Sequence, residues 1–239
     1  MERLQNAYKK LYLHMNTKEG YRLNGKTVFL KDLSHFVGCK GEKYDSSAVK
    51  LLLVGRAVNG WSQFSIDSAE EFAKDAVMQF EDEPLVWIYD EEKGCLGNGN
   101  GYFLNKSPFW RTSREIWKKI SNNVDHIDTA NDKWTDYIAW TNLYKVAPQD
   151  GGNPTTTMRN DQLEACREIL VAEVKALNPT HILFVTGYEG WFDEFEDIVH
   201  GDSIKIVTAC RPEFRNETDY VKDICEKFGI FHGKNDVDI

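Results

Sequence analysis

Four short runs, each at least half apolar, constrain the fold of this chain more than any other feature. They cover residues 49–54, 137–142, 181–186 and 203–208. The first run is nearly all apolar, which is typical of a strand buried on both faces of a parallel sheet, whereas half-exposed strands alternate between apolar and polar residues. Helical segments lie between the runs, the clearest over residues 160–177, where apolar residues share one face. The pattern predicts an α/β fold, a three-layer αβα sandwich with a mostly parallel central sheet of about four strands.

The remaining segments extend this pattern over the whole chain. Further helices are predicted over residues 2–15, 67–80, 109–122 and 219–228, a short helix after residue 187, and short strands at 28–30 and 84–88. The sequence has no internal repeat or long linker, and 41% of its residues are hydrophobic, which suffices for a substantial core. We therefore predict a single domain over residues 1–239, with residues 1–47 as an N-terminal extension packed on it.

Cysteine spacing and the first residues bear on cofactors and location. The cysteines are Cys39, Cys95, Cys166, Cys210 and Cys225, and the closest two are 15 residues apart. Since no C-x-x-C motif is present, we expect buried free thiols, no metal and no cofactor. Charged residues occur throughout residues 1–15, and no apolar run reaches the length of a membrane span. We therefore expect a cytoplasmic protein without membrane contact.

The charge distribution restricts the partners of the chain. Its net charge of −9 excludes a broadly basic surface that coats nucleic acid. The acidity is regional, because residues 67–93 hold ten acidic and two basic side chains, whereas residues 105–120 hold five basic and one acidic. A local basic face beside a binding site is therefore compatible with the sequence.

Polar and aromatic side chains gather where the predicted strands end. Ligands of open α/β sheets bind outside the carboxyl ends of the strands. Those ends are residues 55–61, 141–145, 186–188 and 211–216, and they carry amides, cations and aromatic rings with few carboxylates. This inventory suits a flat ligand with hydrogen-bonding edges, such as a nucleobase or nucleotide. Simpler roles stay open, with Gly55 turning the chain, Asn142 capping a turn and Arg211 as a surface cation.

Motifs of several other enzyme classes are absent from the sequence. It contains no G-x-S-x-G elbow, no P-loop, no H-E-x-x-H and no G-x-G-x-x-G that opens a helix after a strand. The six histidines show no metal-ligand spacing. These absences argue against α/β-hydrolases, P-loop enzymes, zinc proteases and dinucleotide-binding enzymes.

The order of motifs resembles the uracil-DNA glycosylase superfamily. Residues 138–148 are similar to its central T-N-x-x-K strand and following proline, and residues 162–187 to the helix and strand that come next. Residues 101–111 resemble the F…N-R-F-W segment of the mismatch-specific branch, and the resemblance covers about residues 48–216. It implies an enzyme that flips a base into a pocket, stacks it on an aromatic ring, reads its pairing edge with an asparagine and cleaves the N-glycosidic bond.

The resemblance assigns roles to single residues. Asn142 matches the base-reading position, and Tyr102 or Phe103 matches the stacking aromatic. The predicted substrate-binding residues are Gly55, Arg56, Tyr102, Phe103, Asn142 and Lys145.

Both catalytic motifs depart from the family pattern. The first strand end lacks a carboxylate, and Asn59 lies two residues beyond the usual water-positioning asparagine. Arg211 stands where family members generally place a histidine that stabilises the departing base. We predict Asn59 and Arg211 as catalytic residues, because an amide can hold a water and a guanidinium can pair with a developing oxyanion.

Three functions are consistent with these observations. The first is nucleobase binding with hydrolysis of an N-glycosidic bond in DNA, and the second is non-catalytic binding of a nucleotide or nucleic acid on the same fold. The third is an acidic protein-interaction domain that uses Trp61, Trp191 and residues 67–93 to meet a basic partner. The sequence specifies no oligomeric state.

Overall fold

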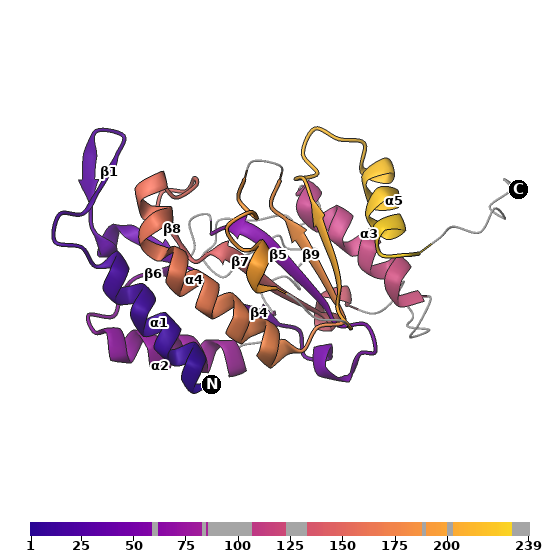
Figure 1. Ribbon diagram of the computed structural model, residues 1–239, viewed down its shortest axis with the longest axis horizontal. Coiled ribbons are helices and arrows are strands. Elements are labelled where there is room, and N and C mark those ends of the chain that lie inside the picture. Colours follow the sequence, from indigo (N-terminus) through magenta and orange to yellow (C-terminus); the bar gives the residue numbers. More distant parts are fainter. Residues whose placement is uncertain are drawn as a thin grey trace, which may run out of the picture.

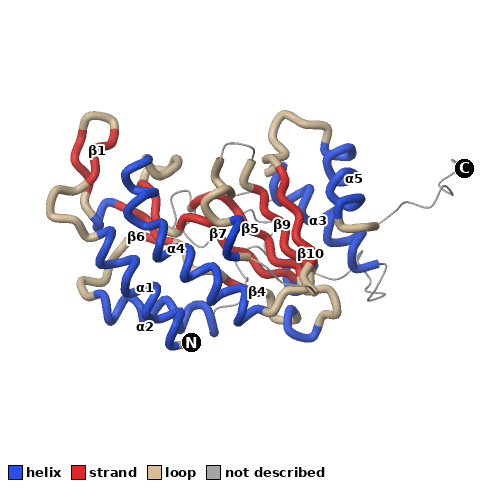
Figure 2. Tube along the Cα trace, viewed as in Figure 1, coloured by secondary structure: helices blue, strands red, loops and turns tan. Residues whose placement is uncertain are grey.

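The computed structural model describes residues 1–58, 62–82, 85, 107–122, 133–187, 190–199 and 203–230. A five-stranded, mostly parallel sheet forms its centre, and helices pack against the sheet (Figures 1 and 2). The predicted α/β class is therefore confirmed. The strand predicted over 84–88 lies outside the described residues except for Leu85.

The four apolar runs form the parallel part of the central sheet. The strand order is β10 (Lys205–Ala209), β9 (His181–Val185), β5 (Leu51–Ala57), β7 (Ile138–Tyr144) and β4 (Cys39–Lys40). The first four strands are mutually parallel, and β4 pairs antiparallel with β7 at the edge. The sheet thus has five strands, one more than predicted, because a two-residue strand leaves no periodicity in a sequence.

Alternating residues of each central strand join two different hydrophobic cores. Helices α1 (Glu2–Met15), α2 (Ala69–Asp82) and α4 (Thr156–Leu177) contribute to one core, and α3 (Pro108–Asn122) and α5 (Glu217–Lys227) to the other. In β5, Leu52 and Val54 belong to the first core, whereas Leu51 and Leu53 belong to the second. Because side chains alternate along a strand, the sheet separates the two cores.

Helix α4 begins earlier than its apolar face predicts. Thr155 is its N-cap, and its side chain accepts a hydrogen bond from the backbone N–H of Met158 at 3.3 Å. The predicted cap, Asn160, lies inside the helix. Three of the first four residues of α4 are polar, so hydrophobic periodicity alone does not detect this turn, whereas the threonine cap does.

Smaller elements surround this sheet. A second sheet has the order β6 (Ser62–Gln63), β3 (Leu33–His35) and β8 (Val146–Pro148), and β1 (Tyr21–Leu23) forms a hairpin with β2 (Lys26–Val28). Single 3-10 turns cover Leu30–Asp32, Tyr44–Ser46, Trp134–Tyr137 and Glu196–Ile198. The last of these replaces the short helix predicted after residue 187. Residues 1–47 therefore contribute strands to both sheets in addition to α1.

Chain direction defines where ligands would meet the sheet. From β5 the chain continues to β7 on one side, whereas from β9 it continues to β10 on the other. The topological switch point therefore lies at the carboxyl ends of β5 and β9, which is where open α/β sheets bind ligands.

No helix in the described part of the chain has both the length and the apolar character needed to cross a bilayer.

Candidate functional site

Gly55 and Asn142 lie side by side near the carboxyl end of the sheet. They are paired in the parallel register of β5 and β7. A side chain at position 55 would collide with Oδ1 of Asn142, so only glycine leaves room for the amide over β5. Asn142 belongs to strand β7, and it therefore does not cap a turn.

The amide group of Asn142 is the most informative polar group near this end of the sheet. Its residue is 2% exposed, and its Nδ2 has no hydrogen-bond partner among the described residues. A buried donor without an acceptor costs about 1–3 kcal/mol, so native structures rarely keep one without a reason. A ligand acceptor at this position would remove that cost.

The polar side chains of the T-N-x-x-K motif lie on two different faces of the sheet. Trp140 packs with the core of α3 and α5, and strand alternation puts Asn142 on that same face. Thr141 points to the opposite face, where its hydroxyl donates to Oε2 of Glu173 in α4 at 2.7 Å. Lys145, just after β7, reaches the same carboxylate.

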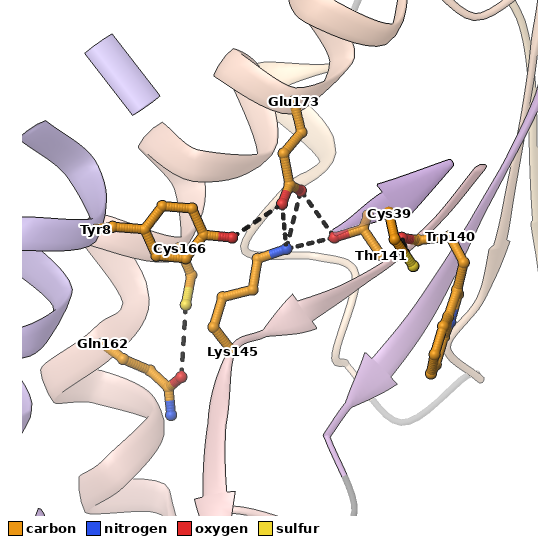
Figure 3. Close-up of polar contacts among 8 residues, drawn as sticks. All are labelled: Tyr8, Cys39, Trp140, Thr141, Lys145, Gln162, Cys166 and Glu173. Carbon is orange, nitrogen blue, oxygen red and sulfur yellow. Dashed lines mark hydrogen bonds and ion pairs between the residues drawn. The ribbon is translucent and has the colours of Figure 1, made fainter. Parts of the chain in front are cut away.

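Glu173 forms a hydrogen-bond network with three other polar side chains, those of Tyr8, Thr141 and Lys145 (Figure 3). The ammonium group of Lys145 donates to Oε1 of Glu173 at 3.0 Å, to Oε2 at 2.8 Å and to the hydroxyl of Thr141. Tyr8 of α1 donates to Oε1 at 3.2 Å, and burial raises the pKa of this phenol well above its usual value. The Lys145 and Glu173 side chains are both fully buried. The network therefore ties α1, α4 and β7 together inside the protein.

Backbone geometry also shapes this network. A Cβ atom at Gly38 would lie 2.6 Å from Oε1 of Glu173, so a larger residue there would displace the carboxylate. On the same helix, the side chain of Gln162 accepts a hydrogen bond from the backbone N–H of Val146 and donates one to its carbonyl, at 2.9 Å each. It thereby satisfies both backbone groups of this β8 residue.

The placement of Lys145 differs from the predicted substrate-binding role. Its three side-chain hydrogen bonds among the described residues go to Glu173 and Thr141, and the side chain has no solvent exposure. Sequence reasoning recognised the lysine but had no means of identifying its partner, since Glu173 is 28 residues away on another element. We therefore assign Lys145 a structural role and omit it from the candidate site.

Arg56 lies at the end of β5, one residue after Gly55. Its guanidinium carbon is 4.8 Å from the ring centroid of Trp191, and Arg159 of α4 approaches the same ring at 4.6 Å. Trp191 is only 7% exposed. It is therefore poorly placed to contact a protein partner, which weakens the interaction-domain hypothesis. Arg159 did not emerge from the sequence analysis, although its place in the first turn of a long helix was a usable signal.

Arg211 lies apart from Asn142. It follows β10, which is separated from β7 by β9 and β5, so the lateral distance is three strand spacings of about 4.8 Å each. Its guanidinium pairs with Glu213, and half of the side chain is exposed. The described residues thus do not bring Arg211 together with Asn142.

The loop after β10 also contains an exposed aromatic residue that sequence reasoning missed. Phe214 is fully exposed and has a φ of 64°, in the left-handed region that bulky residues avoid. Arg211 and Arg215 flank it in the sequence and are exposed as well. The loop therefore presents an aromatic ring and two cations on the surface.

The basic segment at 105–120 is less positive than its sequence indicates. Arg111 forms an ion pair with Glu217 of α5, and Arg114 and Lys118 both contact Glu115. Glu217 of α5 therefore supplies a counter-charge that the charge of residues 105–120 alone does not include.

Several predicted residues lie outside the described part of the chain. They are the catalytic candidate Asn59, the stacking candidates Tyr102 and Phe103, and the surface candidate Trp61. Their roles stay predictions.

The described residues contain no group of three histidine, cysteine or acidic side chains able to hold a metal ion. Cys39, Cys166 and Cys225 are buried free thiols, and Cys210 is partly buried. Burial raises the pKa of the Cys166 thiol to about 12 and that of Cys225 to about 11, which disfavours the nucleophilic thiolate.

Comparison with protein-family models finds none that matches this chain, and comparison with curated proteins likewise finds no match.

Proposed function

We propose that this protein binds a nucleobase, as part of a nucleotide or of DNA, at the carboxyl ends of β5 and β7. The Asn142 amide donates its hydrogen bond to an acceptor on the edge of the base. Gly55 lets that amide lie over the sheet.

The unpartnered Nδ2 of Asn142 carries this proposal. The group is buried, lies near the ligand-binding end of an open α/β sheet, and has no acceptor among the described residues. Nucleobases carry ring and carbonyl acceptors on their edges, and an asparagine amide is a suitable partner for them.

Phe214 supports a nucleic-acid form of the ligand. A fully exposed ring is normally disfavoured, and the left-handed backbone costs a further 1–2 kcal/mol or so. Aromatic rings of this kind stack on unpaired bases or insert between base steps, and neighbouring arginines contact phosphates. The loop of Phe214 follows a parallel strand of the same sheet, so it emerges from the same end as Asn142.

The proposal includes the finer fold that the resemblance implies. We propose a three-layer αβα sandwich of the uracil-DNA glycosylase kind, with residues 1–239 as one domain. Asn59 would then position the attacking water, and Tyr102 or Phe103 would stack on the base. Arg211 would act on a backbone phosphate, since its distance from Asn142 argues against contact with the departing base.

An oligonucleotide assay tests the proposal. Single- and double-stranded oligonucleotides with uracil or a mismatch are incubated with the protein at low salt, and both binding and abasic-site formation are measured. We expect saturable binding that Asn142→Ala weakens by about 10-fold or more, the cost of one buried hydrogen bond. Asn16→Ala, an equivalent change at the exposed C-cap of α1, serves as the matched control and leaves binding unchanged.

The products separate the two forms of the proposal. Abasic sites that depend on Asn142 and Asn59 identify a glycosylase, whereas binding without product identifies a non-catalytic nucleobase-binding protein. Binding that Asn142→Ala leaves intact contradicts both forms. Phe214→Ala adds a second measurement, because it should weaken binding to DNA more than binding to a free nucleoside.

A further inference from the structure

Two arginines share one tryptophan ring at the carboxyl end of the sheet. The guanidinium carbons of Arg56 and Arg159 lie 4.8 and 4.6 Å from the centroid of Trp191. Their separation is therefore at most the sum of these two distances. Stacking on an indole orients a guanidinium and leaves its in-plane N–H groups available as donors.

The three residues come from separate elements that meet at this end. Arg56 is the second-last residue of β5, Arg159 lies in the first turn of α4, and Trp191 follows β9. Because Arg159 contacts the same ring as Arg56, the N-terminal turn of α4 lies near the end of β5. The partial positive charge of a 22-residue helix adds to that of the two arginines.

Thr186 supplies an independent observation. It immediately follows β9, has no solvent exposure, and its Oγ1 has no hydrogen-bond partner among the described residues. Continuing the alternation of β9 places Thr186 on the face of Phe184, which is also the face of Trp191. An unpartnered hydroxyl therefore lies on the same face and at the same end of the sheet as the two arginines.

Two acidic residues that follow Trp191 bond other side chains. Glu194 accepts a hydrogen bond from Tyr144, and Asp197 forms a bidentate ion pair with Arg167 at 2.8 and 2.7 Å. Within the described part of the chain, Arg159 has no acidic partner, and its one side-chain bond is a long contact of 3.5 Å with Thr156. An anion between the two arginines would be attracted to both of them.

We propose that Arg56, Arg159 and Trp191 form a phosphate-binding site at the switch point of the sheet, with Thr186 as a further donor. This proposal rests on the proposed function, because the phosphate would belong to the nucleotide whose base Asn142 contacts. Gly55 and Arg56 are consecutive, so the base site and the phosphate site lie on opposite faces of the same strand end. A bound nucleotide would therefore place its base on one face of this strand end and its phosphate on the other.

Phosphate fits this site better than carboxylate does. A phosphate has at least two charged or partly charged oxygens that point in different directions, and two guanidiniums from different elements can each bind one of them. A carboxylate presents one flat pair of oxygens, which a single arginine satisfies. A phosphate therefore uses both arginines at once.

Calorimetric titrations of the full chain test the proposal with three probes. The probes are a series of deoxynucleosides, the matching 5′-monophosphates, and a short single-stranded oligonucleotide. The variants are Arg56→Gln, Arg159→Gln and Arg159→Lys, and Arg22→Gln in the β1–β2 hairpin is the control for net charge. Urea unfolding of each variant verifies that it is folded.

We expect the monophosphate to bind more tightly than the nucleoside, and we call the ratio of their affinities the phosphate gain. Arg159→Gln should lower this ratio by about 10-fold or more. Arg159→Lys should recover part of it at most, since lysine keeps the charge without the planar fork. If the phosphate belongs to a nucleic-acid backbone, the oligonucleotide shows a larger gain than the monophosphate, and its salt slope falls in Arg159→Gln. A free nucleotide as ligand gives the opposite order.

Failure of this proposal is distinguishable from failure of the proposed function. Nucleoside binding that depends on Asn142, with no gain from phosphate or with a gain that both arginine variants keep, overturns the phosphate site alone. A phosphate gain that depends on Arg159, with no effect of Asn142→Ala, supports the phosphate site and overturns the base-reading role. Equal losses in Arg22→Gln and Arg159→Gln overturn the phosphate site, because they reveal a general effect of charge.

Discussion

Replacement of Lys145 by methionine tests how far the buried network stabilises the fold. Methionine has a similar length and no charge, so the change removes the ammonium group while retaining most of the volume. It leaves the Glu173 carboxylate fully buried, with only the hydroxyl groups of Tyr8 and Thr141 as donors.

The expected loss of stability follows from these contacts. Removal of one partner of a buried ion pair costs about 3–5 kcal/mol, because the other charge stays buried without compensation. Two hydroxyl donors remain on Glu173, which places Lys145→Met in the lower half of that range, about 3–4 kcal/mol. Glu173→Leu leaves a buried ammonium with only Thr141 as acceptor, so its cost lies at the upper end.

Urea unfolding followed by circular dichroism at pH 7 measures these losses. With a slope of about 3 kcal/mol per molar urea, Lys145→Met lowers the midpoint by about 1 M. The matched control is Lys10→Met, since Lys10 of α1 pairs with Glu168 of α4, the helix that also carries Glu173, at 2.7 Å and at a partly exposed position. Exposed pairs contribute up to about 1 kcal/mol, so the control changes the midpoint by 0.3 M or so at most.

The double variant Lys145→Met/Glu173→Leu completes the test. It removes both charges together, and we expect it to be more stable than Glu173→Leu alone. Losses that simply add in the double variant, or a loss below about 1 kcal/mol in Lys145→Met, would refute the reasoning.

Two further predictions concern stability against pH and the glycine beside Asn142. His35 is buried against Phe64 and Phe72, at ring distances of 4.7 and 5.1 Å, and burial lowers its pKa to about 4. Since the unfolded chain binds this proton at about pH 6.5, His35 contributes stability above that pH and loses up to about 3 kcal/mol as the pH falls to 4. In urea unfolding between pH 7 and 4, His35→Leu should show a smaller pH dependence, and an unchanged dependence would exclude His35 as its source. Gly55→Ala should lower the free energy of unfolding by about 1–3 kcal/mol and abolish nucleobase binding, because the added methyl group displaces the Asn142 amide. Binding that calorimetry finds unchanged in this variant would contradict the role of Gly55 in placing the amide.

Local sequence determined the elements whose signal is contained within one short segment. The four parallel strands follow from short runs that are at least half apolar, and most of α4 follows from its apolar face. Asn142 was recognised as a candidate because strand ends gather ligand-binding groups, and its role in binding stays a prediction. These inferences need no knowledge of what packs against the segment.

Tertiary structure decided which polar groups meet. Lys145 was expected beside Asn142, yet strand alternation and the approach of α4 bring it to Glu173 inside the protein. Arg159 meets Arg56 only because Trp191, more than 30 residues further along the chain, lies between their elements. A sequence records that a side chain is charged, but its partner depends on how the helices pack across the sheet. The same lysine or arginine can therefore stabilise the core or meet a ligand, and only the packing distinguishes the two.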